Sequence, residues 1–168
     1  MRFKMIVVFL VLAALLAGCG KGSSVNTVSE NPDAKKGITA VNEFQDIYKD
    51  WANRLTSVAD STDQAYNNWS SGQITKDEFA DITRDLYKET KRLKTESSYN
   101  TVFNLSESDK KLADYDLITS SYSKALIQMN DFLDFLPTLE EQQIVTSYKY
   151  TKKVVNNELK KVKRHLDM

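Results

Sequence analysis

The stretch from Val41 to Trp69 repeats apolar or neutral residues at steps of three and four, without a miss. The positions are Val41, Phe44, Tyr48, Trp51, Leu55, Val58, Thr62, Ala65 and Trp69. An α-helix turns once every 3.6 residues, so this spacing places them on one stripe of an amphipathic helix. The run Ser70-Ser71-Gly72 that follows predicts the end of this first helix.

A second helix is predicted to begin at a capping box, T-x-x-E, formed by Thr75 and Glu78. Ile74 before the cap and Phe79 after it have the spacing of a hydrophobic staple, which fixes the entry of the chain into a helix. We expect the core face to continue through Ile82, Leu86 and Leu93. The helix is expected to end near residues 97–98.

Two more helices are predicted after a connector at residues 99–105. Ser106 with Asp109 offers an N-terminal cap, Pro137 cannot continue a helix, and Thr138 with Glu141 repeats the T-x-x-E box. The seam of the third helix is Leu112, Tyr115, Ile118, Tyr122, Leu126, Met129, Leu133 and Leu136. The seam of the fourth helix is Ile144, Tyr148, Thr151, Val155, Leu159, Val162 and Leu166.

These patterns predict an all-α domain over residues 38–168. The chain has five Gly and two Pro, mostly outside the four segments, and no stretch alternates as a half-buried strand does. Short connections make neighbouring helices antiparallel, which favours an up-down four-helix bundle. The alternative is an elongated coiled coil that dimerises. The first helix fits it, but the seams of the second and third do not sustain strict heptads.

The first eighteen residues have the three parts of a secretory signal peptide. Arg2 and Lys4 form a basic start, residues 5–17 are almost wholly apolar, and small residues follow. The apolar run is shorter than the ~20 residues that span a membrane comfortably. We therefore expect export and cleavage.

The tetrapeptide Leu16-Ala17-Gly18-Cys19 resembles the lipobox of bacterial lipoproteins at all four positions. The resemblance covers about the first twenty residues and concerns location, not activity. It implies that the signal peptidase recognises Leu16, Ala17 and Gly18, and that the Cys19 thiol receives a diacylglycerol, with an N-acyl lipid as an option. The mature chain is then expected on the extracytoplasmic face of the cell membrane, with no other cofactor. The short, lysine-containing linker favours a Gram-positive bacterium.

Residues 20–37 are polar, small and aperiodic, which predicts a flexible linker after the lipidated Cys19. Eighteen such residues span about 25 Å on average. Removing Arg2 and Lys4 leaves 21 basic and 23 acidic residues, a balance that argues against a nucleic-acid partner. With its single Cys acylated, the chain must be stabilised by a packed core.

Residue types for catalysis are sparse. His165 is the only His and falls in the last helical turn, where it suits the helix dipole better than a metal site or a triad. We expect no metal site and no enzyme activity. The densest carboxylates are Asp77, Asp81, Asp85 and Glu89. Arg84, Lys88 and Arg92 run beside them three residues on, which favours an ion-paired solvent face over a cation site.

Two surface features remain as candidates for interaction. The last helix carries Lys149, Lys152, Lys153, Lys160, Lys161, Lys163 and Arg164 against Glu158 and Asp167. These cations either meet anionic lipids or wall polymers, or simply suit the helix C-terminus and solubility. Tyr66 and Tyr150 lie off the seams and with Trp69 offer an exposed aromatic patch for a sugar or a protein partner. The alternative is that they are scattered exposed aromatic residues, which are ordinary on a protein surface.

The functional hypothesis is a non-catalytic binding module at the cell envelope, with an envelope protein or a cell-wall polymer as partner. The candidate contact residues are Tyr66, Trp69, Tyr150, Lys152, Lys153 and Lys160. Two alternatives stay open. The first is a structural spacer or self-assembling coiled coil, and the second is an envelope-surface enzyme that works through paired carboxylates.

Overall fold

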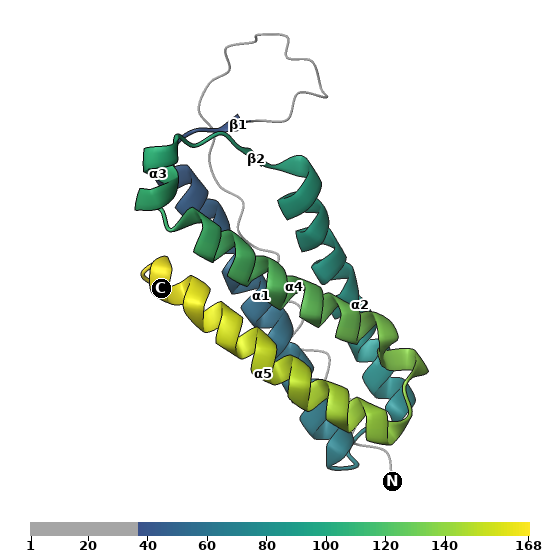
Figure 1. Cartoon of the computed structure of the whole chain (residues 1–168). Helices are drawn as coiled ribbons and strands as arrows, with labels where there is room; N and C mark the ends of the chain where they lie inside the picture. Colours follow the sequence, from purple (N-terminus) through teal and green to yellow (C-terminus); the bar gives the residue numbers. More distant parts are fainter. Residues whose placement is uncertain (1–36) are drawn as a thin grey trace, which may run out of the picture. The chain divides into compact units, whose positions relative to one another are not determined.

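Four long helices account for most of residues 37–168, the part of the chain that the computed structural model describes (Figure 1). They are α1 (Val41–Ser70), α2 (Lys76–Thr95), α4 (Tyr115–Phe135) and α5 (Glu141–His165). Shorter elements are β1 (Gly37–Ile38), the π-helical turn η3 (Glu96–Asn100), β2 (Val102–Phe103), α3 (Glu107–Leu112) and the 3-10 turn η4 (Leu136–Thr138). The predicted lipobox and most of the predicted linker lie outside the described residues.

The long helices pack in the ring order α1, α2, α4, α5, and α5 returns to α1. Each runs antiparallel to its two neighbours, as Figure 1 shows. The prediction of a four-helix bundle is thus confirmed. The seams that the dimeric alternative would bury between two chains are buried here within one.

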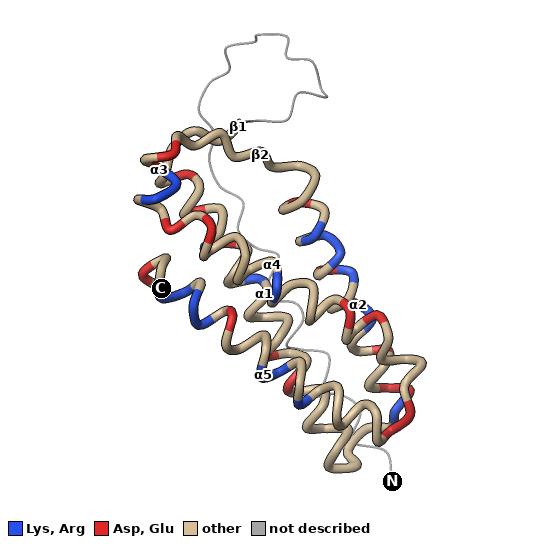
Figure 2. The backbone as a smooth tube through the Cα atoms, in the orientation of Figure 1, with Lys and Arg blue, Asp and Glu red and all other residues tan. Residues whose placement is uncertain are grey.

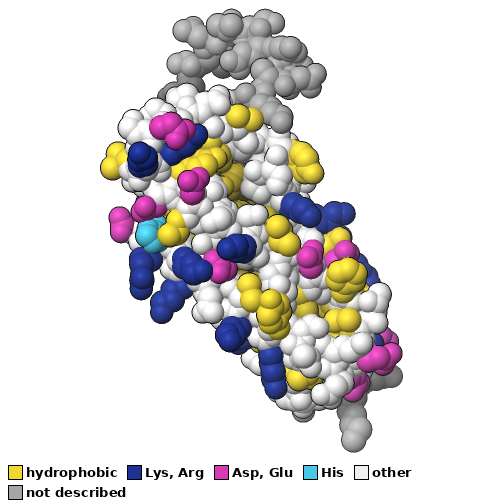
Figure 3. All heavy atoms as spheres, in the orientation of Figure 1, with side chains coloured by type: hydrophobic (Ala, Val, Ile, Leu, Met, Phe, Trp, Pro, Cys, Tyr) yellow, Lys and Arg dark blue, Asp and Glu magenta, His cyan; other side chains and the backbone are white. Residues whose placement is uncertain are grey.

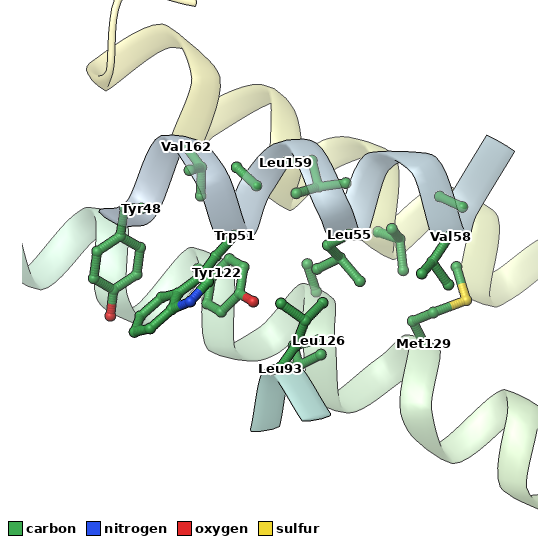
Figure 4. Close-up of a cluster of buried hydrophobic side chains, with 14 of the residues drawn as sticks. Tyr48, Trp51, Leu55, Val58, Leu93, Tyr122, Leu126, Met129, Leu159 and Val162 are labelled. Atoms are coloured by element: carbon green, nitrogen blue, oxygen red, sulfur yellow. The ribbon is translucent and has the colours of Figure 1, made fainter. Parts of the chain in front are cut away.

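The core is built largely from the predicted seams, and Figure 4 shows part of it, with Tyr48, Trp51, Leu55 and Val58 of α1 among the buried side chains. All nine seam positions of α1 face inward: seven are buried, and Val41 and Trp69 are half-buried. Leu55 and Phe44 have no exposed surface. Rings dominate one end, where Tyr122 of α4 stacks on Trp51 with centroids 5.8 Å apart. The whole seam of α5 is also buried, from Ile144 to Leu166.

The predicted core face of α2 was wrong at Ile82, which is 44% exposed. The inward position is taken by Thr83, whose hydroxyl donates to the Phe79 carbonyl at 3.0 Å. Further along, the Thr90 hydroxyl donates to the Asn130 side chain of α4 at 3.1 Å. Both threonines are buried because these hydrogen bonds satisfy their hydroxyls. The prediction chose Ile82, three residues after Phe79, because it is apolar. The buried position is Thr83, four residues after Phe79.

The predicted third helix is broken in two. Asp114 adopts a left-handed conformation with φ of 49°, which separates α3 from α4. As a result Leu112, expected on the core seam, is 76% exposed on α3. The predicted cap at Ser106 is confirmed, because its hydroxyl accepts the Asp109 amide at 3.2 Å.

A short parallel ladder was not predicted. Gly37 pairs with Val102 and Ile38 with Phe103, and the Asn104 amide donates to the Ile38 carbonyl at 2.7 Å. Gly37, expected to end the linker, is thus the first residue of β1. Two residues are too few to leave an alternating pattern in a sequence. The ladder holds the start of α1 near the end of α2.

The two predicted capping boxes had different outcomes. At α2 the Glu78 amide donates to the Thr75 hydroxyl at 3.2 Å, and the Thr75 amide donates to the Glu78 carboxylate at 2.8 Å, which confirms the box. At α5 the box at Thr138 was wrong, because η4 draws Thr138 into a turn behind Pro137. The Glu140 amide instead donates to the Gln143 side chain at 2.8 Å.

We expect Thr75→Ala to lower the free energy of unfolding by about 1 kcal/mol, because it removes the acceptor at the helix start. Thr138→Ala should cost less than about 0.5 kcal/mol, since that exposed hydroxyl only donates to the Phe135 carbonyl. Urea unfolding of both variants, followed by far-ultraviolet circular dichroism, measures the difference. An equal loss in the two variants would contradict the assignment of Thr75, and not Thr138, as a helix N-cap.

Candidate functional site

Helix α5 has the largest excess of positive charge in the described chain, although Figure 2 shows Lys and Arg also on α2 and α3. Helix α5 carries seven Lys and Arg against two Asp and Glu. The other residues between 37 and 168 include eleven Lys and Arg against nineteen Asp and Glu. Helix α5 is therefore strongly electropositive, whereas the rest of the described chain has a net negative charge; α2 is close to balanced, with six Lys and Arg against five Asp and Glu.

Packing determines where these cations lie. The seam of α5 turns inward against α1 and α4, so the positions between seam residues face solvent. Lys153, Asn156, Lys160 and Lys163 follow at steps of three and four, which aligns them along one side of the helix. Figure 3 shows several Lys and Arg side chains projecting along this part of the molecule.

Two cations of α5 have close carboxylate partners. Lys152 pairs with Asp63 of α1, and Lys161 pairs with Glu158 at 2.8 Å. The hydrogen bond from Lys152 to Asp63 raises the pKa of the ammonium. Burial, and then the hydrogen bond that the Tyr148 hydroxyl donates to Asp63, raise the pKa of Tyr148 to about 12. Lys152, a candidate contact residue, is thus engaged in joining α5 to α1.

Five other cations of α5 have no ion-pair partner within residues 37–168. They are Lys149, Lys153, Lys160, Lys163 and Arg164, and we call them the basic face. Lys153 and Lys160 were candidates from the sequence and both are exposed. The other three extend the candidate set along the same helix.

The predicted aromatic patch does not form. Tyr66 is buried, with its ring stacked on Tyr148 at a centroid distance of 3.5 Å. Trp69 is half-buried and stacks on Phe79 at 5.6 Å. Tyr150 is 61% exposed, as expected, but no ring contact joins it to the other two in the described part of the chain. Tyr66 is off the α1 seam, but its ring packs on Tyr148 of α5. The spacing of apolar residues along α1 could not predict this contact.

A groove of about 480 Å³ runs between α1 and α5 beside the basic face. Its lining residues are Thr56, Ala59, Asp60, Asn156, Leu159, Lys160, Lys163, Arg164 and Met168. Three of the five cations of the basic face therefore line a depression and not a convex surface. Sequence reasoning missed the groove because it could not tell which α1 residues lie opposite α5.

Three of the four carboxylates in the row on α2 have the predicted ion pairs, and the structure of residues 37–168 shows none for Asp77. Asp81 pairs with Arg84 at 2.7 Å, and Asp85 pairs with Lys88 at 2.7 Å. Glu89 approaches Arg92 at 3.8 Å. The exposed side chains of this row neutralise one another, which confirms the interpretation as a salt-bridged solvent face. No cluster of three or more His, Cys, Asp and Glu with the geometry of a metal site occurs between residues 37 and 168.

Glu89 and Glu96 also converge on Arg54 of α1, an arrangement that the sequence did not predict. The Arg54 guanidinium pairs with Glu89 at 2.8 Å and with Glu96 at 2.7 Å. Trp51 donates its ring N–H to Glu96 at 3.2 Å, and the pKa of Glu96 is lowered, first of all by the hydrogen bond from Arg54. These partners are 35 and 42 residues from Arg54, so no local pattern announces them. The cluster joins α1 to the end of α2.

His165 lies in the last turn of α5, as predicted, and one of its ring nitrogens is 2.8 Å from the Asp114 carboxylate. The contact links the end of α5 to the break between α3 and α4. No helix between residues 37 and 168 is both long enough and apolar enough to cross a membrane. Comparisons of the chain with models of known protein families, with curated proteins and with solved structures find no match.

Proposed function

We propose that this chain is a lipid-anchored, non-catalytic binding module on the extracytoplasmic face of a bacterial membrane. In this proposal the basic face of α5 binds an anionic polymer of the cell envelope. One observation carries the proposal: five cations without ion-pair partners in the described chain lie on one helix of an otherwise acidic domain.

The charge separation supports binding in one orientation. A cation close to a strongly anionic surface contributes about 1 kcal/mol, and several cations on one face act together. The excess of Asp and Glu on α1 and α4 repels the same polymer from those helices. The bundle is therefore expected to approach with α5 foremost, and to bind less tightly as salt screens the exposed charges.

The ion pairs that occupy the carboxylates of α2 and η3 support a non-catalytic role. A carboxylate mechanism needs an acid and a base that are close together and free to exchange protons. Glu89 and Glu96 approach each other through Arg54, which engages both. Asp81 and Asp85 are held by neighbouring cations on an exposed face.

The anchor rests on the lipobox-like sequence at Cys19, which lies outside the described residues. Each buried methylene of an acyl chain contributes about 0.8 kcal/mol, so two chains hold a protein on a membrane where one would exchange. The polar composition of residues 20–36, which also lie outside the described residues, predicts a linker that would allow the domain to turn toward its ligand.

Neutralising the basic face should weaken binding to a purified wall-polymer fraction by at least about tenfold. The variant changes all five residues to Gln: Lys149, Lys153, Lys160, Lys163 and Arg164. The matched control changes five cations of other elements: Lys49, Lys76, Lys94, Lys111 and Lys124. Co-sedimentation at two salt concentrations compares them, and the control should bind like the unaltered protein. Equal losses in the two variants would overturn the assignment to α5.

Cys19→Ser should move the protein from the membrane fraction to the medium, or leave it unprocessed, because the hydroxyl cannot replace the thiol that accepts the lipid. Ser23→Ala, in the same polar segment, is the control and should stay with the membrane. Fractionation of cells that produce each variant gives the answer. A Ser variant that is processed and retained as firmly as the original would contradict the lipid anchor.

A further inference from the structure

The groove between α1 and α5 has a more specific chemistry than a basic surface. Lys160, Lys163 and Arg164 form its α5 wall, together with the amide of Asn156. Residues 163 and 164 follow residue 160 by three and four positions, so the three side chains leave the helix on the same side. An Arg guanidinium presents paired N–H donors that match two phosphate oxygens, and Lys adds compact positive charge.

The opposite wall of the groove carries a carboxylate, which favours a ligand that also has a positive group. Asp60 of α1 lines the groove and has no ion-pair partner in the part of the chain that the structure describes. Thr56 beside it donates its hydroxyl to the Ala52 carbonyl at 2.7 Å, so this hydroxyl is not an extra donor for a ligand. A purely anionic ligand would therefore face three cations on one wall and an uncompensated carboxylate on the other.

Between the charged walls the surface is apolar. Ala59 and Leu159 line the groove and are buried, so we take them as its floor, and Met168 also lines it with 44% of its surface exposed. A short hydrocarbon segment can rest on such a floor while its charged ends reach opposite walls. The volume of about 480 Å³ lies within the range of small-ligand sites.

We propose that this groove binds a phosphate ester that carries an ammonium group a few bonds away. The phosphate lies against Lys160, Lys163 and Arg164, and the ammonium lies against Asp60. The inference rests on the proposed function and deepens it, because it names the unit of an envelope component that the basic face would recognise. A polymer substituent and a lipid headgroup share this chemistry, and the experiment separates the two sources.

Two soluble probes of the same phosphodiester type test the groove: glycerophosphoethanolamine, which carries the ammonium, and glycerophosphoglycerol, which does not. Isothermal titration calorimetry of the intact protein should show about fivefold tighter binding of the first probe, the worth of one exposed ion pair. Asp60→Asn should abolish this preference. The double variant K163Q/R164Q should weaken binding of both probes by about tenfold or more, whereas the matched control K76Q/K94Q should leave both unchanged.

Two results would overturn the proposed ligand of the groove. The first is that neither probe binds, and the second is that Asp60→Asn still prefers glycerophosphoethanolamine. A proton–nitrogen spectrum provides a second readout, because the Asn156 side-chain amide should shift with glycerophosphoethanolamine and stay unshifted in the double variant. If Asp60→Asn fails to fold, the wild-type preference and the double variant still decide.

Competition then separates the sources. Glycerophosphoethanolamine should release the protein from the wall-polymer fraction if the unit belongs to the polymer. Release only from phosphatidylethanolamine vesicles would assign it to a lipid headgroup and would overturn the polymer as its source. If the five-residue variant loses wall binding but the unaltered protein binds neither probe, the proposed ligand of the groove is refuted and the proposed function is not. Unaltered wall binding in that variant would refute the proposed function itself.

Discussion

The packing of the α5 seam against α1 and α4 determines both the core and the pattern of exposed charge. Seven seam residues from Ile144 to Leu166 are buried, so the rotation of the helix about its axis is determined by the core. The same rotation sends Lys153, Lys160 and Lys163 outward and brings Lys152 to Asp63. The apolar seam of α5 therefore packs the core and also determines which charged side chains of α5 are exposed to solvent.

Much of the fold could be predicted because its strongest signals are local. The unbroken seam of α1 and the box at Thr75 each combine several residues within a few turns, and both are confirmed. The errors arise where the burial or backbone conformation of a residue departs from what its residue type suggests. Thr83 turns inward at the position expected for Ile82, and Asp114 in a left-handed conformation breaks the third helix.

The candidate site divides in the same way. The excess of cations on the last helix is visible in the sequence, as is the ion-paired row on α2. Whether a given cation is free depends on the other helices, because Lys152 finds its partner at Asp63, far away along the chain. The same limit hid the groove, since Asp60 and Lys160 become neighbours of one depression only when α1 lies beside α5. Tyr66 failed as a surface candidate because Tyr148 covers it.

Whether α5 is the binding surface can be decided by mapping which lysines the bound polymer covers. Acetylation of the intact protein, free and bound to the wall polymer, can be read at each lysine by mass spectrometry. We predict slower acetylation on binding at Lys149, Lys153, Lys160 and Lys163, with Lys94 of α2 unchanged. Protection that falls on α2 instead, or no protection at α5 in the bound state, would contradict the assignment of binding to the basic face.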